Sequence, residues 1–200
     1  MIIKVCGLKY GENLLEVSQL KIDMVGFNFY PSSARYVDQP LPKINQDIQK
    51  VGVFVNATTS FIEEKVEQYQ LDMIQLHGDE SLDFCREISL TLKPVIKVFR
   101  VDKDFDYDPI KDYAFCKYLL FDTATKDYGG SGHKFDWSLL LQQNLETPFL
   151  LAGGISLEDA AILKSFSHPS FAGIDINSKF ELSPGLKDPT MIEDFIRQMR

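Results

Sequence analysis

The sequence predicts an α/β protein built as a single, compact (β/α)8 TIM barrel that spans residues 1–200. Short apolar runs rich in β-branched and aromatic residues alternate with longer segments of mixed polarity, a pattern typical of parallel strands joined by helices. Eight such runs are present. Each unit therefore averages about 25 residues, which is compact for a fold that typically needs about 250 residues.

The predicted elements follow one another along the whole chain. The strand-like runs are IIKVC from Ile2, MVGFNF from Met24, VGVFV from Val51, DMIQL from Asp72, VIKVF from Val95, YLLFD from Tyr118, FLLAG from Phe149 and AGIDI from Ala172. The helix-like segments are 12–19, 42–50, 59–69, 81–90, 136–143, 157–165 and 189–199. The fifth helical connection, around 108–116, is short. Thr59 and Ser81 are candidate N-caps, and Pro189 suits a first helical turn.

An open, doubly wound sheet is the structural alternative. Its dinucleotide-binding form has a GxGxxG turn after the first strand, whereas this chain reads CGLKYGEN there. In a barrel, the loops that follow the strands converge at one end, and that end carries the chemistry. Candidate functional residues are therefore expected where the strands end.

The composition limits the partners and the compartment. Lys and Arg number 21 against 29 Asp and Glu, and the net charge of −8 argues against nucleic acid or an anionic membrane as the main partner. No apolar run reaches membrane-spanning length, and the first residues lack the longer apolar stretch of a signal peptide. Cys6, Cys85 and Cys116 fit free thiols in a reducing compartment, so we expect a cytoplasmic protein.

Polar and glycine residues gather at the predicted strand ends. In chain order these are Cys6, 28–35, 75–77, Asp122, 153–154 and 175–178. The histidines, His77, His133 and His168, do not show the spacing of a metal site. We therefore expect neither a metal nor a cofactor.

Six segments of the chain resemble, in order, the successive motifs of the phosphoribosylanthranilate isomerase family. They are IKVCGLK, GFNFYPSSARYV, QLHGDE, LFDTATKDYGGSGHKFDW, LLAGGI and GIDINSKFELSPGLKD. CGL or AGGI alone would be weak evidence. The linked series, with GGSGHKFDW and SPGLKD, runs through nearly the whole chain and is specific.

This resemblance implies an isomerase of tryptophan biosynthesis. The reaction is the Amadori rearrangement of N-(5-phosphoribosyl)anthranilate to 1-(2-carboxyphenylamino)-1-deoxyribulose 5-phosphate. The furanose ring opens to a Schiff base, the proton on sugar C2 is lost to give an enolamine, and tautomerisation yields the ketone. One acid and one base suffice, without a cofactor. The implied partner is this small phosphosugar carrying anthranilate, and the enzyme is expected to be a monomer or a homodimer.

The resemblance makes Cys6 the base and Asp122 the acid. Alternation places Ile2, Lys4 and Cys6 on one face of the first strand, so Cys6 sits at the barrel mouth if that face points inward. A thiol has an ordinary pKa of about 8.5, and a cation such as Lys4 would help to ionise it. The alternative for Cys6 is a small buried apolar residue, and for Asp122 a capping or turn carboxylate.

The substrate has two anionic groups, for which different residues are expected. Arg35 is expected to hold the anthranilate carboxylate through paired hydrogen bonds, unless it is a surface arginine. The phosphate is expected across Gly153, Gly154 and the loop of Asn177 and Ser178, where backbone N–H groups can bind it. Lys179 stands where the family is expected to have glycine, which changes the loop geometry or adds a charge.

Three further positions belong to the predicted site. His77 and Asp175 follow strands and are expected to line it without an assigned proton, although purely structural hydrogen bonding is equally compatible. Gly132 belongs to a glycine-rich loop, 129–132, that can lie over the substrate.

Two other functions remain compatible with parts of the sequence. Another phosphosugar barrel, an epimerase or a synthase, would share the AGGI loop without needing Cys6 and Arg35 together. A non-catalytic phosphosugar-binding module would need neither Cys6 nor Asp122.

Overall fold

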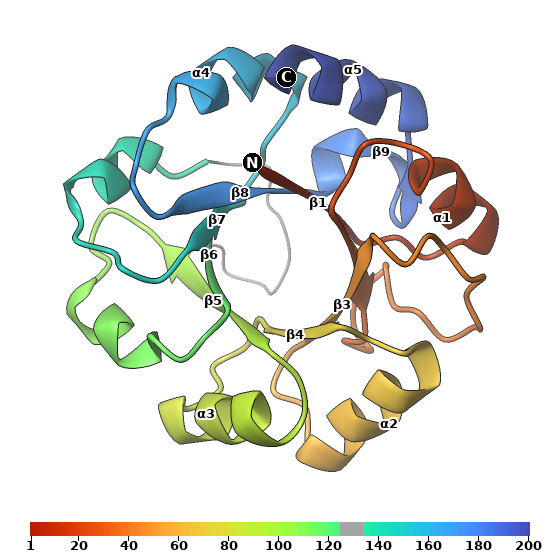
Figure 1. Ribbon diagram of the computed structural model, residues 1–200, viewed down its shortest axis with the longest axis horizontal. Helices are drawn as coiled ribbons and strands as arrows, with labels where there is room; N and C mark the ends of the chain where they lie inside the picture. Colours follow the sequence, from red (N-terminus) through yellow and green to blue (C-terminus); the bar gives the residue numbers. More distant parts are fainter. Residues whose placement is uncertain (125–133) are drawn as a thin grey trace.

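The computed structural model describes residues 1–124 and 134–200, whose strands close into a barrel. The eight barrel strands pair in parallel in the order of the sequence, and the eighth strand pairs with the first (Figure 1). They are β1 (Ile2–Cys6), β2 (Met24–Asn28), β3 (Gln49–Phe54), β4 (Met73–Leu76), β5 (Val95–Val101), β6 (Tyr118–Thr123), β7 (Phe149–Leu151) and β8 (Phe171–Ile176). The predicted (β/α)8 barrel is therefore confirmed.

Helices surround the barrel, as Figure 1 shows. The α-helices are α1 (Gly11–Val17), α2 (Thr59–Tyr69), α3 (Leu82–Thr91), α4 (Ala160–Ser165) and α5 (Pro189–Met199). The 3₁₀ helices are η1 (Asp108–Tyr113), η2 (Trp137–Gln142), η3 (Leu157–Asp159) and η4 (Ser178–Phe180). In the described parts of the chain, none of the helices has the length and apolar character needed to cross a bilayer.

The helix starts follow the capping rules with one shift. Ser81 caps α3, because its side chain accepts the N–H of Phe84. The cap of α2 is Thr58 rather than Thr59, and its side chain accepts the N–H of Phe61. Pro189 occupies the first turn of α5 as expected.

The predicted helix over 42–50 is wrong. Residues 42–45 have no regular structure, 46–48 form a turn and bend, and β3 already begins at Gln49. The side chain of Asn45 accepts the N–H of Asp47 at 3.1 Å, a local bond that competes with helical hydrogen bonding. Pro40 and Pro42 precede the turn and also remove backbone donors. The short fifth connection is the 3₁₀ helix η1. The helix predicted over 136–143 is the 3₁₀ helix η2 (Trp137–Gln142) rather than an α-helix.

The barrel separates two apolar cores. The larger core lies between the strands and the helices. The smaller one fills the barrel with Met24, Val51, Met73, Ile96, Val98, Leu120, Leu150 and Ala152. Ile2 packs against this inner core, and Lys4 and Cys6 are buried on the same face of β1, so the predicted alternation is confirmed.

A hairpin that the sequence pattern did not indicate follows η4. Its strands are β9 (Glu181–Ser183) and β10 (Leu186–Lys187), and they pair antiparallel. Gly185 in the turn has a φ of 88°, a conformation that favours glycine. The hairpin therefore adds charged side chains to the end of the barrel where the strands finish.

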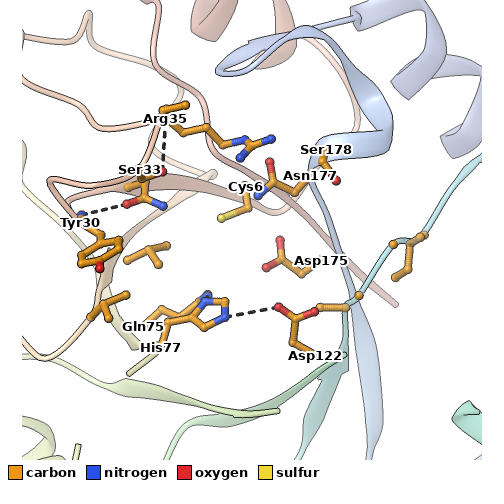
Figure 2. Close-up of a pocket in the computed structure, with 18 of the residues that line it drawn as sticks. Cys6, Tyr30, Ser33, Arg35, Gln75, His77, Asp122, Asp175, Asn177 and Ser178 are labelled. Atoms are coloured by element: carbon orange, nitrogen blue, oxygen red, sulfur yellow. Dashed lines mark hydrogen bonds and ion pairs between the residues drawn. The ribbon is translucent and has the colours of Figure 1, made fainter. Parts of the chain in front are cut away.

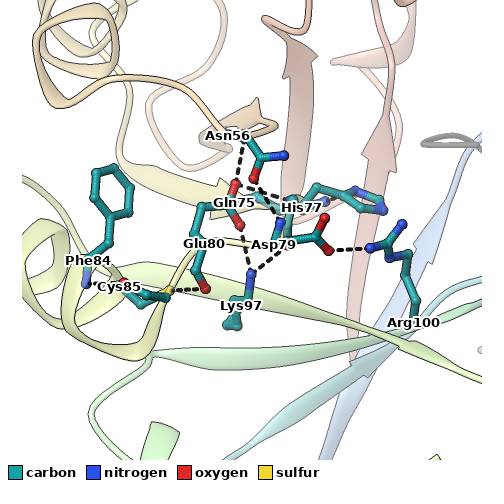
Figure 3. A network of polar contacts seen from close by, with 11 residues as sticks. Asn56, Gln75, His77, Asp79, Glu80, Phe84, Cys85, Lys97 and Arg100 are labelled. Atoms are coloured by element: carbon teal, nitrogen blue, oxygen red, sulfur yellow. Dashed lines mark hydrogen bonds and ion pairs between the residues drawn. The ribbon is translucent and has the colours of Figure 1, made fainter.

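A buried ion pair secures the loop after β4 (Figure 3). Lys97 of β5 lies 2.7 Å from Glu80 and donates to the carbonyl of Gly78 at 2.9 Å. The other carboxylate oxygen of Glu80 accepts the N–H groups of Asn56 and Gly78 at 2.9 and 3.0 Å. The pair thus fixes the loops that follow β3 and β4, including the neighbourhood of His77.

We expect Lys97→Met to destabilise the protein by about 3–5 kcal/mol, because the Glu80 carboxylate would remain buried without its cation. The matched control is Lys103→Met. Lys103 forms an exposed pair with Asp104 at 3.8 Å, which should contribute little. Urea unfolding followed by circular dichroism measures both variants, and equal free energies of unfolding would contradict the structural role of the Lys97 pair.

Candidate active site

One pocket at the carboxyl ends of the strands collects the predicted site residues (Figure 2). The predicted residues that line it are Cys6, Arg35, His77, Asp122, Gly153, Gly154, Asp175, Asn177 and Ser178. Gly132 lies outside the described residues. Asn28, Tyr30 and Gln75, which carried no predicted role, line the same pocket.

Cys6 ends β1 with its thiol in this pocket, and the fold leaves space for the sulfur at Gly26. A Cβ at position 26 would lie 2.7 Å from the Cys6 Sγ, so any residue larger than glycine at this position of β2 would displace the thiol. The residue is only 5% exposed. Cys6 therefore has a fixed position facing the pocket.

The surroundings of Cys6 favour the neutral thiol. Burial raises the pKa of Cys6, and the Asp175 carboxylate raises it further, whereas Lys4 and Lys187 lower it. Lys4 acts in the expected direction, but burial outweighs it. The Lys4 Nζ is fully buried and lies 2.8 Å from the Asp175 carboxylate, so this cation has a carboxylate partner in addition to Cys6.

Asp175 and Gln75 present unused acceptors beside the pocket. The Asp175 Oδ1 and the Gln75 Oε1 are buried and have no hydrogen-bond partner among the described residues. Burial raises the pKa of Asp175 despite its pairing with Lys4. Because buried polar atoms in native proteins are nearly always satisfied, these two oxygens are available to accept hydrogen bonds from groups that enter the pocket.

His77 connects Gln75 to Asp122. The His77 Nδ1 lies 3.3 Å from the Gln75 Nε2, and the His77 Nε2 lies 3.3 Å from the Asp122 Oδ2. With the Gln75 amide as donor, Nδ1 accepts and Nε2 carries the hydrogen that faces Asp122. The other oxygen of Asp122 accepts the N–H of Thr123 at 2.8 Å. These contacts hold the carboxyl of Asp122 at the pocket wall.

The loops after β7 and β8 form the adjoining part of the pocket. Gly153 and Gly154 have φ values of 84° and 67°, and a Cβ at Gly153 would lie 2.3 Å from the Thr123 Oγ1. The backbone therefore passes close to β6 only because position 153 is glycine. Lys179 is exposed and belongs to η4, whose backbone does not require glycine at that position.

Arg35 lines the pocket, but its guanidinium is already bound by a carboxylate. The Arg35 Nε lies 2.9 and 3.1 Å from the two oxygens of Glu181, and the Arg35 Nη2 lies 2.6 Å from Glu181 Oε2. Lys187 approaches the same carboxylate at 2.7 Å. Although burial raises it, hydrogen bonds from Arg35 and Lys187 hold the pKa of Glu181 below its ordinary value.

Sequence reasoning gave no role to Glu181, Lys187 or Gln75. Glu181 and Lys187 stand on either side of SPG, a turn sequence whose flanking residues pair when the turn forms a hairpin. That spacing was the signal that could have indicated their contact. Lys4 was considered only as a neighbour of Cys6.

Comparisons with known proteins show the family of this chain. Residues 3–198 match the family model for N-(5'phosphoribosyl)anthranilate (PRA) isomerase. The N-(5'-phosphoribosyl)anthranilate isomerase of Parabacteroides distasonis is 45% identical over 206 residues, which cover 100% of this chain and 93% of that protein.

Solved structures also match over the full length. The crystal structure of phosphoribosyl anthranilate isomerase from Thermotoga maritima has a TM-score of 0.86 and 34% identity, covering 100% of this chain and 98% of that chain. A crystal structure of phosphoribosyl anthranilate isomerase in complex with reduced 1-(o-carboxyphenylamino)-1-deoxyribulose 5-phosphate has a TM-score of 0.83 and 31% identity, with the same coverage. The chain therefore belongs to the N-(5'-phosphoribosyl)anthranilate isomerase family.

Proposed function

We propose that this chain converts N-(5'-phosphoribosyl)anthranilate to 1-(2-carboxyphenylamino)-1-deoxyribulose 5-phosphate by acid–base catalysis. The observation that carries the proposal is that the Cys6 thiol and the Asp122 carboxyl, from β1 and β6, line one pocket. A related structure holds a reduced form of this product, which supports the same ligand class here.

The two groups divide the reaction between them. Protonated Asp122 donates to the ring oxygen, and the furanose opens to the Schiff base. The Cys6 thiolate then removes the proton from sugar C2, which gives the enolamine and, after tautomerisation, the ketone. His77 lies against Asp122 at 3.3 Å and orients the carboxyl. The free oxygens of Asp175 and Gln75 are suited to accept hydrogen bonds from sugar hydroxyls.

We assign different residues of the pocket to the two anionic groups of the substrate. Backbone N–H groups around Gly153, Gly154 and Ser178 are proposed to bind the phosphate, and Arg35 the anthranilate carboxylate. This pairing favours the isomerase over an epimerase or synthase, which would need no group for a benzoate. Loss of the fluorescence of the anthranilate substrate on adding protein tests the proposal, and turnover would also exclude a non-catalytic binding module.

Cys6→Ala and Asp122→Asn should each lower kcat by about 10²-fold or more, the usual scale of general acid–base catalysis. Cys6→Ala deletes the proposed base, and Asp122→Asn keeps the shape of the side chain but removes the acidic proton. Cys85→Ala is the matched control, because that residue of α3 is buried, its thiol bonds to the Glu80 carbonyl, and it does not line the pocket. Full activity in either site variant would remove that residue from the mechanism.

The activity of the free enzyme should show a bell-shaped dependence on pH. The active form combines the Cys6 thiolate with protonated Asp122, so the pair carries one proton, whereas it carries two at low pH and none at high pH. Burial raises the pKa of Cys6, so the last proton should leave only above the ordinary thiol value of about 8.5. We therefore expect kcat/KM to stay level up to about pH 8.5 and to fall above it, and the residual activity of Cys6→Ala should lack this fall. A wild-type profile that still rises above about pH 9 would contradict the assignment of the pair.

Activity should survive exhaustive treatment with a chelator. The rearrangement only relocates protons, and the proposed groups supply and accept them without a Lewis acid. Turnover is measured before and after chelation and again after adding divalent metal. Loss on chelation with recovery on adding metal would show that a metal takes part.

A further inference from the structure

The guanidinium of Arg35 has two edges that can bind a carboxylate, and Glu181 occupies one of them. A guanidinium carries five N–H groups in a planar fork. Glu181 binds the Nε edge, with Nε at 2.9 and 3.1 Å and Nη2 at 2.6 Å. The contact leaves both Nη1 hydrogens and one Nη2 hydrogen, and the remaining Nη2 hydrogen forms the opposite edge with one of the Nη1 hydrogens. This edge can bind a second carboxylate through two parallel hydrogen bonds.

Glu181 is held firmly enough to fix the arginine. Its Oε1 accepts from the Lys187 Nζ at 2.7 Å and from the Gly185 N–H at 3.1 Å. Its side chain is only 4% exposed. Exposed ion pairs change geometry freely and contribute little, whereas this carboxylate has donors from the hairpin and from Arg35 at once. The orientation of the guanidinium is therefore set before a ligand arrives.

Lys187 is itself fixed from several sides. Its Nζ also lies 2.6 Å from the Asn177 Oδ1, on the loop after β8. Its backbone N–H and carbonyl bond to the side chain of Asn13 on α1 at 2.7 and 2.9 Å. The ammonium is completely buried. Lys187 thus anchors the carboxylate to α1 and to the rim of the pocket.

The cluster of Arg35, Lys187 and Glu181 has a net positive charge, which favours the binding of one anion. Arg35 and Lys187 contribute two positive charges and Glu181 one negative charge, so the group keeps one excess positive charge beside the pocket. Arg35 and Asn177 both pack against Gly7, where a Cβ would come within 2.7 Å of each. Figure 2 shows the guanidinium beside Asn177, at the end of the pocket near Cys6.

We propose that Glu181 is a positioning residue that sets the specificity for a carboxylate-bearing aromatic amine: it holds the Nε edge of Arg35 so that the opposite edge binds the anthranilate carboxylate. This inference rests on the proposed function. The competing mechanism is that Glu181 occupies Arg35 as a rival of the substrate and must be displaced. The two mechanisms predict opposite effects of removing the charge of Glu181.

The test measures the binding of two stable ligands by titration calorimetry. One is the reduced product, which carries the carboxyl group, and the other is the same compound with a plain phenyl ring. For Glu181→Gln we expect the Kd of the carboxylated ligand to rise roughly tenfold, the scale of a charge-assisted hydrogen bond, and the Kd of the phenyl ligand to change little. In steady-state assays the same variant should raise KM more than it lowers kcat.

Two further variants make the result specific. In an Arg35→Ala background, Glu181→Gln should cause no additional loss, because Glu181 acts through Arg35. Glu193→Gln is the matched control, since Glu193 and Arg197 form an exposed pair on α5 at 3.7 Å. It should leave both Kd values unchanged. If Glu181→Gln does not fold, Glu181→Asp, which keeps the charge but reaches less far, should show the same selective loss in smaller measure.

Four outcomes would overturn the inference. Tighter binding of the carboxylated ligand to the Glu181 variants would show that Glu181 competes with the ligand for Arg35. Unchanged binding would show that Glu181 has no part in carboxylate recognition. Equally weaker binding of both ligands would show that Glu181 only supports the structure of the hairpin. Equal affinity of the wild-type protein for both ligands would remove carboxylate recognition altogether. Failure of the wild-type protein to turn over N-(5'-phosphoribosyl)anthranilate, with selective binding retained, would instead refute the proposed function alone.

Discussion

Pairing of β8 with β1 is the constraint on which the site depends, because it closes the barrel and brings the two ends of the chain together. The register sets Ile2 beside Gly173 and Lys4 beside Asp175. A Cβ at position 173 would lie 2.1 Å from the carbonyl oxygen of Ile2, so the strands can approach only at a glycine. The same pairing places Asp175 next to Lys4 and beside the pocket that Cys6 lines.

The buried pair of Lys4 and Asp175 is not expected to stabilise the barrel more than apolar side chains would. Both side chains are nearly or fully buried, and an apolar pair of similar volume would usually be as stable or more stable. The inner core of the barrel is otherwise apolar, with residues such as Met24 and Leu150. Lys4 and Asp175 both lie within barrel strands, and Asp175 lines the pocket with one carboxylate oxygen that has no partner among the described residues. Such a pair is typical of residues kept for function at the expense of stability.

The sequence predicted the barrel well because each strand is a short apolar run, buried on both faces and bounded by polar residues. It failed over 42–50, where a local bond from the Asn45 side chain outweighs a weak helical pattern. The pocket residues could be found because strand ends must converge in a barrel. The contact between Arg35 and Glu181 could not be predicted, because the tertiary fold alone brings these residues together and no motif or spacing in the sequence indicates it.

Two charged networks at this end of the barrel show why location, rather than residue type, decides what an ion pair does. Lys97 and Glu80 face away from the barrel interior, and their bonds to Gly78 and Asn56 use the available acceptors and donors to fix loops. Arg35 lines the pocket and binds Glu181 through its Nε edge, so Glu181 does not use the other edge of the guanidinium. A saturated network can only support structure, whereas one with a remaining donor edge at a pocket can support structure and bind an anion at the same time.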